Sequence, residues 1–500
     1  DHPGRSQQAA LDQQGAMELV AAALRVHTSS ARVQGRGVAA LENLIHCHPE
    51  RQNKCVWLGG VELVTQAMRL HPTSQEVQDF GCAALRDLAH NHEEGRAELV
   101  SLGGAELALA AMRGHPNAAM VQACGCALLG HMTLRSLDER ARVLAGGAFQ
   151  AVLGAMRAHP ELAKVQACGC AALGNFCHDG VASAPSPQAA HEGIELVLQA
   201  LQNHLEDADV QCCGCTALHN LTDDVQARAR LIAMGGVAII TSTMHAHQMD
   251  VSVQACCLKV ASLLAGDGGD NALMLLEAHG TEQVVKAMQL LSDDASMQER
   301  GCKTLRIIAS SSPEGQLRVA SCGGIALVLA AVRSHAESSS LQSEAALYVY
   351  PMVQGNDRNR SSFVSQGGLE TLLAALESFH GDAAIQHSAW LALESLSLDR
   401  VARKKFRDLG VGPKAPGCMK AFVTDVDLQG CALEVLLCSP ATDAEGLAEI
   451  EAADGVEVVL EAIRKHIDVE KVVSLGCDLL QKMVGRTADQ AELPLALRGD

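Results

Sequence analysis

A 44-residue internal repeat constrains this 500-residue chain more than any other feature. A glycine that precedes an apolar stretch recurs eleven times from Gly15 to Gly455, at intervals of 43 to 46 residues. A second register runs in step with the first, since an apolar residue followed by glutamine recurs nine times from Gln34 to Gln386. Two locked registers indicate a repeat architecture rather than one globular core, which stops growing near ~250–300 residues.

Each repeat predicts three helices. The glycine suits the left-handed residue that ends a short first helix. The middle helix follows, as in the second repeat, where Val61, Val64 and Met68 lie on one face. An Arg-x-His-Pro motif ends this helix because proline cannot continue it, and the third helix opens near the glutamine. We therefore expect an all-α, right-handed α-solenoid of about eleven three-helix repeats of ~44 residues, in which stacking buries what one repeat cannot.

The registers also predict boundaries and irregular segments. Residues 1–10 form an N-terminal tail, and residues 11–500 form the solenoid. An irregular loop is expected at 178–192, where two prolines and two serines replace the first helix of the fifth repeat. This loop is either a tolerated insertion or a hinge or docking segment. Residues 400–450 are expected to be irregular, with Asp427 in the place of Gln386, and Pro351 predicts a kink in a third helix.

Net charge and composition restrict the classes of molecule that this chain is expected to bind. The 39 Lys and Arg against 58 Asp and Glu give a net charge of −19, which argues against nucleic acid, because phosphate binding requires clustered cations. The 7 Phe, 2 Trp and 2 Tyr offer little for base stacking. Apolar runs of about 18 residues do not occur in the sequence, so direct membrane insertion is not expected. The expected partners are protein or peptide segments that carry basic charge.

The 19 cysteines lie in apolar helical stretches, where reduced cysteine acts as a small hydrophobe. The chain is therefore expected in the cytoplasm or another reducing compartment. One repeat position, predicted to be core, holds Cys82, Cys126, Cys170, Cys215, Cys302, Cys431 and Cys477. A second position holds Cys124, Cys168, Cys213 and Cys256. Zinc requires about four donors, which residues two apart on a helix do not supply, so no metal is expected. Redox sensing by an exposed thiol is the alternative.

Other candidate sites have structural interpretations. Nine histidines at the ends of middle helices, from His27 to His466, are expected to bind the unpaired carbonyls of the helix end. The segment from Asp425 to Gly430 resembles the start of a calcium loop, but Leu436 stands where the bidentate Glu is needed. The sequence contains no nucleophile, phosphate-loop or zinc-protease motif. We accordingly expect no catalytic residues, no cofactor and no metal ligands.

The repeat length and one well-preserved unit resemble armadillo repeats over about residues 11–490. That unit includes Gly60-Val61-Glu62-Leu63-Val64, Met68-Arg69, Val77-Gln78 and Gly81-Cys82-Ala83-Ala84-Leu85. Armadillo proteins such as importin-α and β-catenin are binding scaffolds, and the His-Pro variety is most similar to stretches of leucine-rich-repeat kinases and of large protist proteins. The resemblance implies a concave groove lined by third helices, where a Trp and an Asn hold an extended peptide.

The resemblance also supplies the candidate binding residues. The family's Asn position holds Asn43, Asp87, His131, Asn175 and Asn220 in the first five repeats. The Trp position holds Lys259 and Lys303 in the sixth and seventh repeats, and no repeat keeps the Trp. The glutamines have two interpretations: each either ties its third helix to the loop of its own or the adjacent repeat, or lies exposed in the groove and binds the partner's backbone.

The expected function is a non-enzymatic protein–protein interaction scaffold that binds partner segments along this groove. It acts either as a soluble scaffold or as a subunit of a large assembly. Because the chain begins at Asp1 without an initiator Met, we expect a processed chain or a piece of a longer one. The alternative function is therefore the regulatory armadillo arm of a larger multidomain enzyme, such as a kinase.

Overall fold

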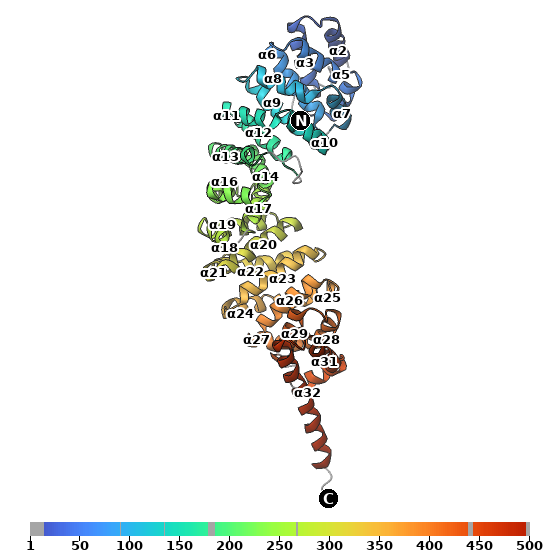
Figure 1. Cartoon of the computed structure of the whole chain (residues 1–500), viewed down its shortest axis with the longest axis vertical. Coiled ribbons are helices and arrows are strands. Elements are labelled where there is room, and N and C mark those ends of the chain that lie inside the picture. Colours follow the sequence, from blue (N-terminus) through green and yellow to red (C-terminus); the bar gives the residue numbers. More distant parts are fainter. Residues whose placement is uncertain are drawn as a thin grey trace. The chain divides into compact units, whose positions relative to one another are not determined.

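The computed structural model describes residues 15–90, 92–134, 136–178, 186–266, 269–438 and 444–496, and within these ranges it contains 31 helices and no strand (Figure 1). The chain divides into unit 1, residues 1–263, and unit 2, residues 264–500, each considered separately below. The all-α expectation is confirmed. Eleven repeats follow one another in sequence order, and nine of them show all three helices among the described residues.

The helices of unit 1 fall into three sets. The first helices are α4 (Pro49–Trp57), α7 (Glu93–Ser101), α10 (Leu137–Ala145) and α15 (Val225–Ala233). The middle helices are α2 (Ala16–Val26), α5 (Gly60–Leu70), α8 (Gly104–Gly114), α11 (Ala148–Ala158), α13 (Pro187–Asn203) and α16 (Gly236–Ala246). The third helices are α3 (Ala31–Ile45), α6 (Gln75–Ala89), α9 (Ala119–Met132), α12 (Ala163–Phe176), α14 (Ala208–Leu221) and α17 (Val251–Ala265).

Unit 2 repeats the same three sets. Its first helices are α18 (Gly269–Glu277), α21 (Pro313–Ser321), α24 (Asp357–Ser365), α27 (Arg400–Asp408) and α30 (Ala444–Ala452). Its middle helices are α19 (Gly280–Leu290), α22 (Gly324–Ser334), α25 (Gly368–Ser378), α28 (Val411–Ala421) and α31 (Gly455–Lys465). Its third helices are α20 (Ala295–Ser311), α23 (Ser339–Val353), α26 (Ala383–Leu396), α29 (Val426–Cys438) and α32 (Glu470–Ala496).

The turn between the first and middle helices confirms the predicted left-handed residue. Seven glycines at this turn have φ between 62° and 90°: Gly59, Gly103, Gly147, Gly235, Gly323, Gly367 and Gly410. His279 and Asp454 adopt the same conformation in two other repeats, with φ of 58° and 63°. A side chain with a Cβ is strained at such angles. In most repeats this left-handed residue stands just before the register glycine, which is itself the first residue of the middle helix, as Gly60 is in α5. A Cβ on Gly60 would lie 2.7 Å from the Cys55 carbonyl oxygen, so close packing requires a glycine there.

Ten buried glutamines fix each third helix to the middle helix of its own repeat. Every one of these amides donates from Nε2 to the carbonyls ten and seven residues earlier, over 2.7 to 3.3 Å. Gln166, for example, donates to Met156 and His159 and is 3% exposed. The carbonyl ten residues earlier belongs to the last turn of the middle helix, where carbonyls lack a partner within the helix. The carbonyl seven residues earlier belongs to the residue after that helix and also accepts a backbone N–H, as His159 does from Leu162. The structural interpretation of the glutamines is therefore confirmed.

Histidines at the ends of the middle helices connect one repeat to the preceding one. In seven repeats the ring Nε2 donates to a backbone carbonyl 42 to 44 residues earlier, as from His159 to Pro116 over 2.9 Å. The expected bond to a carbonyl of the same helix end is found at His380, whose Nδ1 lies 3.4 Å from the Glu377 carbonyl, and is wrong for these seven histidines. The repeat position of His380 was misassigned, because Phe379 caps α25 there.

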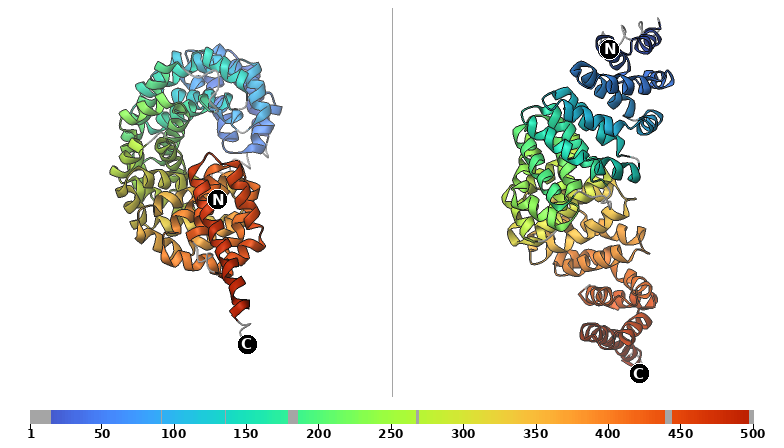
Figure 2. Two further views of the ribbon diagram at one scale, coloured as in Figure 1. Left: turned by 60° about the horizontal axis from the view of Figure 1, so that its bottom comes forward. Right: turned by 45° about the horizontal axis from the view of Figure 1, so that its top comes forward.

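Within each unit, consecutive third helices pack directly on one another, in pairs such as α12 and α14 or α20 and α23 (Figure 2). The cysteines at the predicted core position lie at these contacts. Cys82, Cys126, Cys170, Cys215 and Cys302 are 0% exposed. Burial raises the pKa of the Cys82, Cys126 and Cys170 thiols. These thiols therefore act as core side chains, as predicted.

Several sequence-based boundaries need correction. Residues 179–185 and the tail 1–10 lie outside the described residues, but α13 already begins at Pro187, inside the predicted 178–192 loop. Residues 400–438, expected to be irregular, form α27, α28 and α29. Proline is tolerated in these helices: α28 includes Pro416, and α23 continues past Pro351 to Val353.

The register of the tenth repeat also shifts by two residues. Gln429, not Asp427, donates to Met419 and Phe422 in the way that Gln386 donates to Leu376 and Phe379. Cys431 consequently belongs to the second cysteine position, with Cys124 and its equivalents. Cys477 is exposed on α32, where no third helix of a later repeat packs within the described residues.

Candidate functional site

The third helices present one common face. We call third-helix face the positions one, two, five, eight and nine residues after the buried glutamine, which fall on one side of a helix with 3.6 residues per turn. The glutamine bonds orient every third helix identically within its repeat, so equivalent positions of neighbouring helices come together. All seven candidate residues predicted from the sequence lie at these positions.

Position nine holds the polar row, which we define as Asn43, Asp87, His131, Asn175 and Asn220. Its members reach toward neighbouring backbone. The Asn220 Nδ2 donates to the Gly174 carbonyl of the preceding third helix over 2.9 Å. The Asn175 amide lies against Gly130, which holds the same place one repeat earlier. Asn43, in the first repeat, donates to Ala39 of its own helix over 2.8 Å. The row thus connects adjacent helices while Asn175 and Asn220 stay half-buried.

His131 is held in its neutral form. Burial, followed by the neighbouring His90, lowers the pKa of His131 to about 4. The His90 Nδ1 lies 3.3 Å from the His131 Nε2, and the two ring centroids are 4.7 Å apart. At neutral pH His131 therefore offers an uncharged aromatic ring rather than positive charge.

The two candidate lysines differ in their surroundings. Lys259 is half-buried on α17 in unit 1, one turn after Cys256. Lys303 is exposed on α20 in unit 2. The structure therefore groups Lys259 with the residues of unit 1 and places Lys303 on a separate unit.

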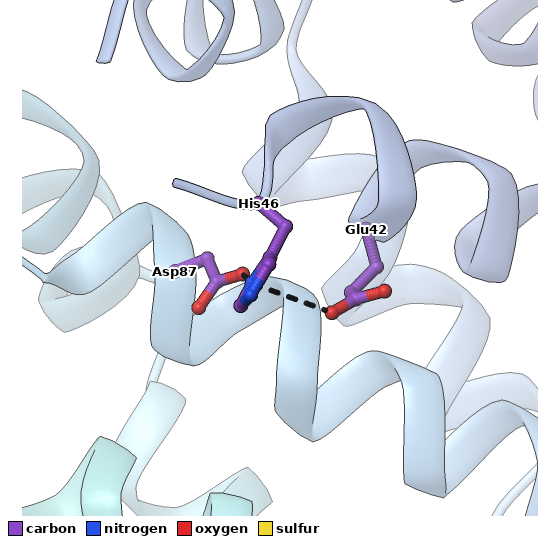
Figure 3. Close-up of side chains that lie close together, drawn as sticks. All are labelled: Glu42, His46 and Asp87. Atoms are coloured by element: carbon purple, nitrogen blue, oxygen red, sulfur yellow. Dashed lines mark hydrogen bonds and ion pairs between the residues drawn. The ribbon is translucent and has the colours of Figure 1, made fainter. Parts of the chain in front are cut away.

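An acid–histidine cluster, formed by Glu42, His46, Arg86 and Asp87, joins α3 to α6. The His46 Nδ1 lies 2.8 Å from the Asp87 carboxylate and 3.8 Å from that of Glu42 (Figure 3). Arg86 contacts Asp87 at 2.7 Å and Glu42 at 3.8 Å. The carboxylate side chains are only 12% and 9% exposed, whereas His46 is 53% exposed. Burial, followed by the charge of Asp87, raises the pKa of Glu42.

The cluster has the spacing of a small cation site. One ligand atom each from Glu42, His46 and Asp87 lies within 4.8 Å of the others. Three such groups are the usual donors of a zinc ion with one open position. The Arg86 guanidinium, however, already pairs with both carboxylates and would repel a second cation. The present contacts fit best an ion-pair connection between two repeats whose exposed His46 edge faces the solvent.

Thiols line the same face further along unit 1. Cys124, Cys168, Cys213 and Cys256 occupy position two on four consecutive third helices, and we call them the thiol row. Cys212 precedes Cys213, and its Sγ lies 3.3 Å from the Sγ of Cys256. A second pair, Cys215 and Cys257, lies deeper between the same two helices at 3.5 Å and is fully buried.

The third-helix face of unit 2 is charged instead. Arg306 of α20 pairs with Glu344 of α23 at 3.1 Å. Glu394 of α26 accepts from Cys431 of α29 over 2.8 Å and pairs with Lys471 of α32 at 3.0 Å. Ionic side chains therefore connect the third helices here, at positions that hold amides, glycines and thiols in the middle of unit 1.

Sequence reasoning found the polar row but missed two groupings. The acid–histidine cluster combines an i, i+4 pair with an aspartate 41 residues later, and the Cys212–Cys256 pair joins two different repeat positions. A position-by-position comparison of neighbouring repeats could have suggested both groupings. In each of them the two partners are separated by about one repeat length, 41 residues for His46 and Asp87 and 44 residues for Cys212 and Cys256.

Two further observations concern the whole chain. Among the helices that the structure describes, none is by itself long and apolar enough to cross a membrane, although two bent pairs, α15–α16 and α21–α22, pass a test of length and composition. The 19 cysteines all lie in described residues, and none forms a disulfide.

Comparisons with known proteins agree with this geometry. No curated protein sequence matches the chain. A solved structure from a study of a phosphorylation switch that controls the interaction between cadherin and beta-catenin is similar, with a TM-score of 0.70 and 15% sequence identity over 94% of this chain and 91% of that chain. At this identity the likeness concerns the fold, which is an armadillo solenoid. The family model described as "LRRK2 ARM repeat" matches residues 3–186 and 188–410. The protein therefore belongs to the LRRK2 ARM repeat family of armadillo-repeat proteins.

Proposed function

We propose that this protein is a non-enzymatic interaction scaffold that binds a segment of a partner protein along the third-helix face of unit 1. The observation that carries the proposal is the polar row, which places a hydrogen-bonding side chain at the same position in five consecutive repeats. Armadillo solenoids are generally interaction scaffolds, and the similar solved structure comes from a study of cadherin binding by beta-catenin.

The amides retain bonding capacity after they have tied the helices together. A side-chain amide has two N–H donors and an oxygen with two lone pairs. Asn220 uses one donor on Gly174, so its oxygen and second donor can pair with the backbone of an extended segment. Small neighbours such as Ala127 and Ala171, at position five, leave room for a chain to approach.

Charge supports a basic partner segment. The chain carries a net charge of −19, and the acid–histidine cluster adds two carboxylates against one arginine on the same face. Attraction between opposite charges raises the rate of association and weakens as salt rises. We expect nucleic acid to bind poorly for the same reason.

The test compares variants of the full chain. Wild-type protein, the double variant Asn175→Ala/Asn220→Ala and the control Asn203→Ala are used to capture partners from a native lysate, and the dissociation constant of the main partner is then measured. Asn203 is exposed at the end of α13, on the middle helix of the same repeat as Asn220. We expect the double variant to lose about tenfold or more in affinity, about 1.4 kcal/mol or more, and the control to lose none.

If wild type, the double variant and the control bound the partner with equal affinity, the third-helix face would not be the binding surface. Binding that does not weaken between low and high salt would contradict the basic partner, and tight binding of duplex DNA would overturn the class of partner. A complex that remains intact and large during size-exclusion chromatography of the lysate would indicate a fixed subunit of an assembly rather than a soluble scaffold.

The family match favours one alternative. Because the matched model describes the ARM repeats of LRRK2, the chain could serve as the regulatory armadillo arm of a larger multidomain enzyme such as a kinase. Reading the flanking open reading frame tests this directly, since a catalytic domain encoded in frame would support the arm. We propose a cytoplasmic or otherwise reducing location for either role, because the core thiols are unpaired.

A further inference from the structure

Two thiols meet between the fifth and sixth repeats. Cys212 lies on α14 and Cys256 on α17, and their Sγ atoms are 3.3 Å apart. Both side chains are half-buried, so a small molecule can reach them. The neighbouring Cys215–Cys257 pair joins the same helices at 3.5 Å but is completely buried. The two pairs therefore differ in access to solvent more than in sulfur–sulfur distance.

The surroundings give the two half-buried thiols different roles. The Thr216 hydroxyl lies 3.3 Å from the Cys256 sulfur, and Lys259 follows one turn later on the same helix. The hydrogen bond from Cys212, with those of Thr216 and the charge of Lys259, lowers the pKa of Cys256 to about 6 against the effects of burial and Asp250. The same hydrogen bond, followed by burial, raises the pKa of Cys212. Either sulfur can be the donor in this contact, and we assign Cys256 as the nucleophilic thiolate because the Lys259 charge lowers its pKa.

We propose that Cys212 and Cys256 form a redox modification site at which a hydroperoxide produces a disulfide between two repeats. The Cys256 thiolate attacks the peroxide, so that an S–O bond forms, the O–O bond breaks and the leaving alkoxide or hydroxide takes a proton. Cys212 then attacks the sulfenic sulfur, an S–S bond forms, and the hydroxyl leaves as water with the Cys212 proton. In sum, two thiols and one hydroperoxide give one disulfide, one alcohol or water, and one further water.

The disulfide would act on the third-helix face. Its S–S length of about 2.05 Å is shorter than the present 3.3 Å contact, so the two sulfur atoms must move together, and the bond then ties α14 to α17. Asn220 lies on α14 and Lys259 on α17, both among the candidate binding residues. Formation of the disulfide does not depend on the proposed scaffold function. An effect of oxidation on the affinity for a partner does rest on that proposed function.

The experiment uses the full reduced chain and stoichiometric hydrogen peroxide. After alkylation of free thiols, digestion with trypsin and an aspartate-specific protease and fragment-ion mass spectrometry locate the linkage. We expect a Cys212–Cys256 disulfide in the wild type, and in Cys212→Ser a sulfenic acid at Cys256 that a dimedone probe traps. Cys256→Ser should lose both products. Cys213→Ser is the matched control, since Cys213 is also half-buried on α14, and it should behave like wild type.

Three results would overturn the proposal. The first is the absence of a Cys212–Cys256 linkage in oxidised wild type, which needs no variant and so does not depend on how the variants fold. The second is oxidation of Cys256 no faster than that of Cys47, an exposed thiol on the same unit. The third is linkage of Cys256 to Cys213 in place of Cys212. Partner affinity, measured before and after oxidation, then tests the binding effect separately.

Discussion

The middle of unit 1 and the whole of unit 2 use the same repeat but join neighbouring third helices differently. From α9 to α17 the connecting positions hold asparagine, glycine and cysteine, with bonds such as Asn220 to Gly174. In unit 2 ion pairs join α20 to α23, through Arg306 and Glu344, and join α26 and α29 to α32, through Lys471 with Glu394 and Glu434. The buried glutamines and the histidine bonds are present in both regions. The buried contacts that hold each repeat together are therefore the same in both regions. The residues that connect neighbouring third helices differ: they are amides and thiols in the middle of unit 1 and ion pairs in unit 2.

The largest expected effect comes from cross-linking the thiol region. A disulfide between Cys212 and Cys256 closes a loop of 44 residues, which in the chain-entropy model stabilises unit 1 by about 4 kcal/mol. Thermal unfolding of oxidised and reduced protein measures this, with Cys212→Ser as the control that should not respond. A melting transition that oxidation leaves unchanged in wild type would show that strain in the bond cancels the entropic gain.

The next prediction concerns what the two regions share. Gln166→Ala in unit 1 leaves the buried Met156 carbonyl without its side-chain donor, and Gln342→Ala in unit 2 does the same to the Val332 carbonyl, whereas His159 and His335 keep a backbone N–H donor. Each change should reduce the free energy of unfolding by about 1–3 kcal/mol. Urea denaturation of both variants, with the exposed-site variant Asn203→Ala as reference, measures the loss. A cost in one unit only would mean that the glutamine is a requirement of that region and not of the repeat.

Packing under the third helix offers a finer comparison. Three residues after the glutamine, repeat four has Gly169, whereas repeat nine has Ala389. A Cβ on Gly169 would lie 2.5 Å from the Met156 Cγ, so Gly169→Ala should destabilise the protein by about 1 kcal/mol after the gain in helix propensity is counted. Ala389 is fully buried, so Ala389→Gly should cost about 1 kcal/mol through helix propensity and about as much again through the lost methyl contacts. Denaturant midpoints compare the two, and a stabilised Gly169→Ala protein would show that Met156 moves aside freely.

The smallest predicted effect is a difference in the pH dependence of stability between Glu42 and Glu394, which occupy the same repeat position. Burial and Asp87 raise the pKa of Glu42, so its contribution to stability is complete below the unfolded pKa of about 4.3 and is lost as the pH rises through the folded value. For Glu394, burial raises the pKa, but hydrogen bonds from Cys431, Glu434 and Lys471 outweigh it and lower the pKa. Its contribution is present above about 4.3 and is lost as the pH falls through the folded value.

Substitution by glutamine should therefore act in opposite directions. As the pH rises from 4 to 7, Glu42→Gln should gain stability relative to wild type, and Glu394→Gln should lose it, each by less than about 1 kcal/mol. Chemical denaturation at a series of pH values in low salt measures both. Parallel curves for the two variants would show that the surroundings of this position do not differ in the way the contacts indicate.

Much of the fold followed from the registers, because a repeated corner glycine and a repeated buried amide report on local backbone geometry. The recurrence of Gln166 and its equivalents leaves two interpretations, a structural tie or an exposed groove residue, and the two buried hydrogen bonds of Gln166 decide for the tie. The tenth repeat misled the alignment, since Gly430 was matched to the packing glycine, whereas Ala432 takes that place three residues after Gln429. The candidate site was harder to predict. The pairing of His46 with Asp87 depends on how two helices 41 residues apart pack, which no periodicity within one helix reveals.

The histidine bonds have a consequence for how such a chain can change in length. Each ring donates to a carbonyl 42 to 44 residues earlier, in the loop of the preceding repeat. Removing or duplicating one complete repeat brings an equivalent carbonyl to the same place, so every ring still finds an acceptor. An insertion inside one of the intervening helices shifts that helix and separates the partners, whereas small changes in loop length are accommodated, since the bonds span 42, 43 or 44 residues. The chain should therefore tolerate the loss or gain of whole repeats. A deletion of residues 117–160, which is one repeat length, should preserve a bond from His204 to a proline carbonyl, because Pro116 then takes the place of Pro160.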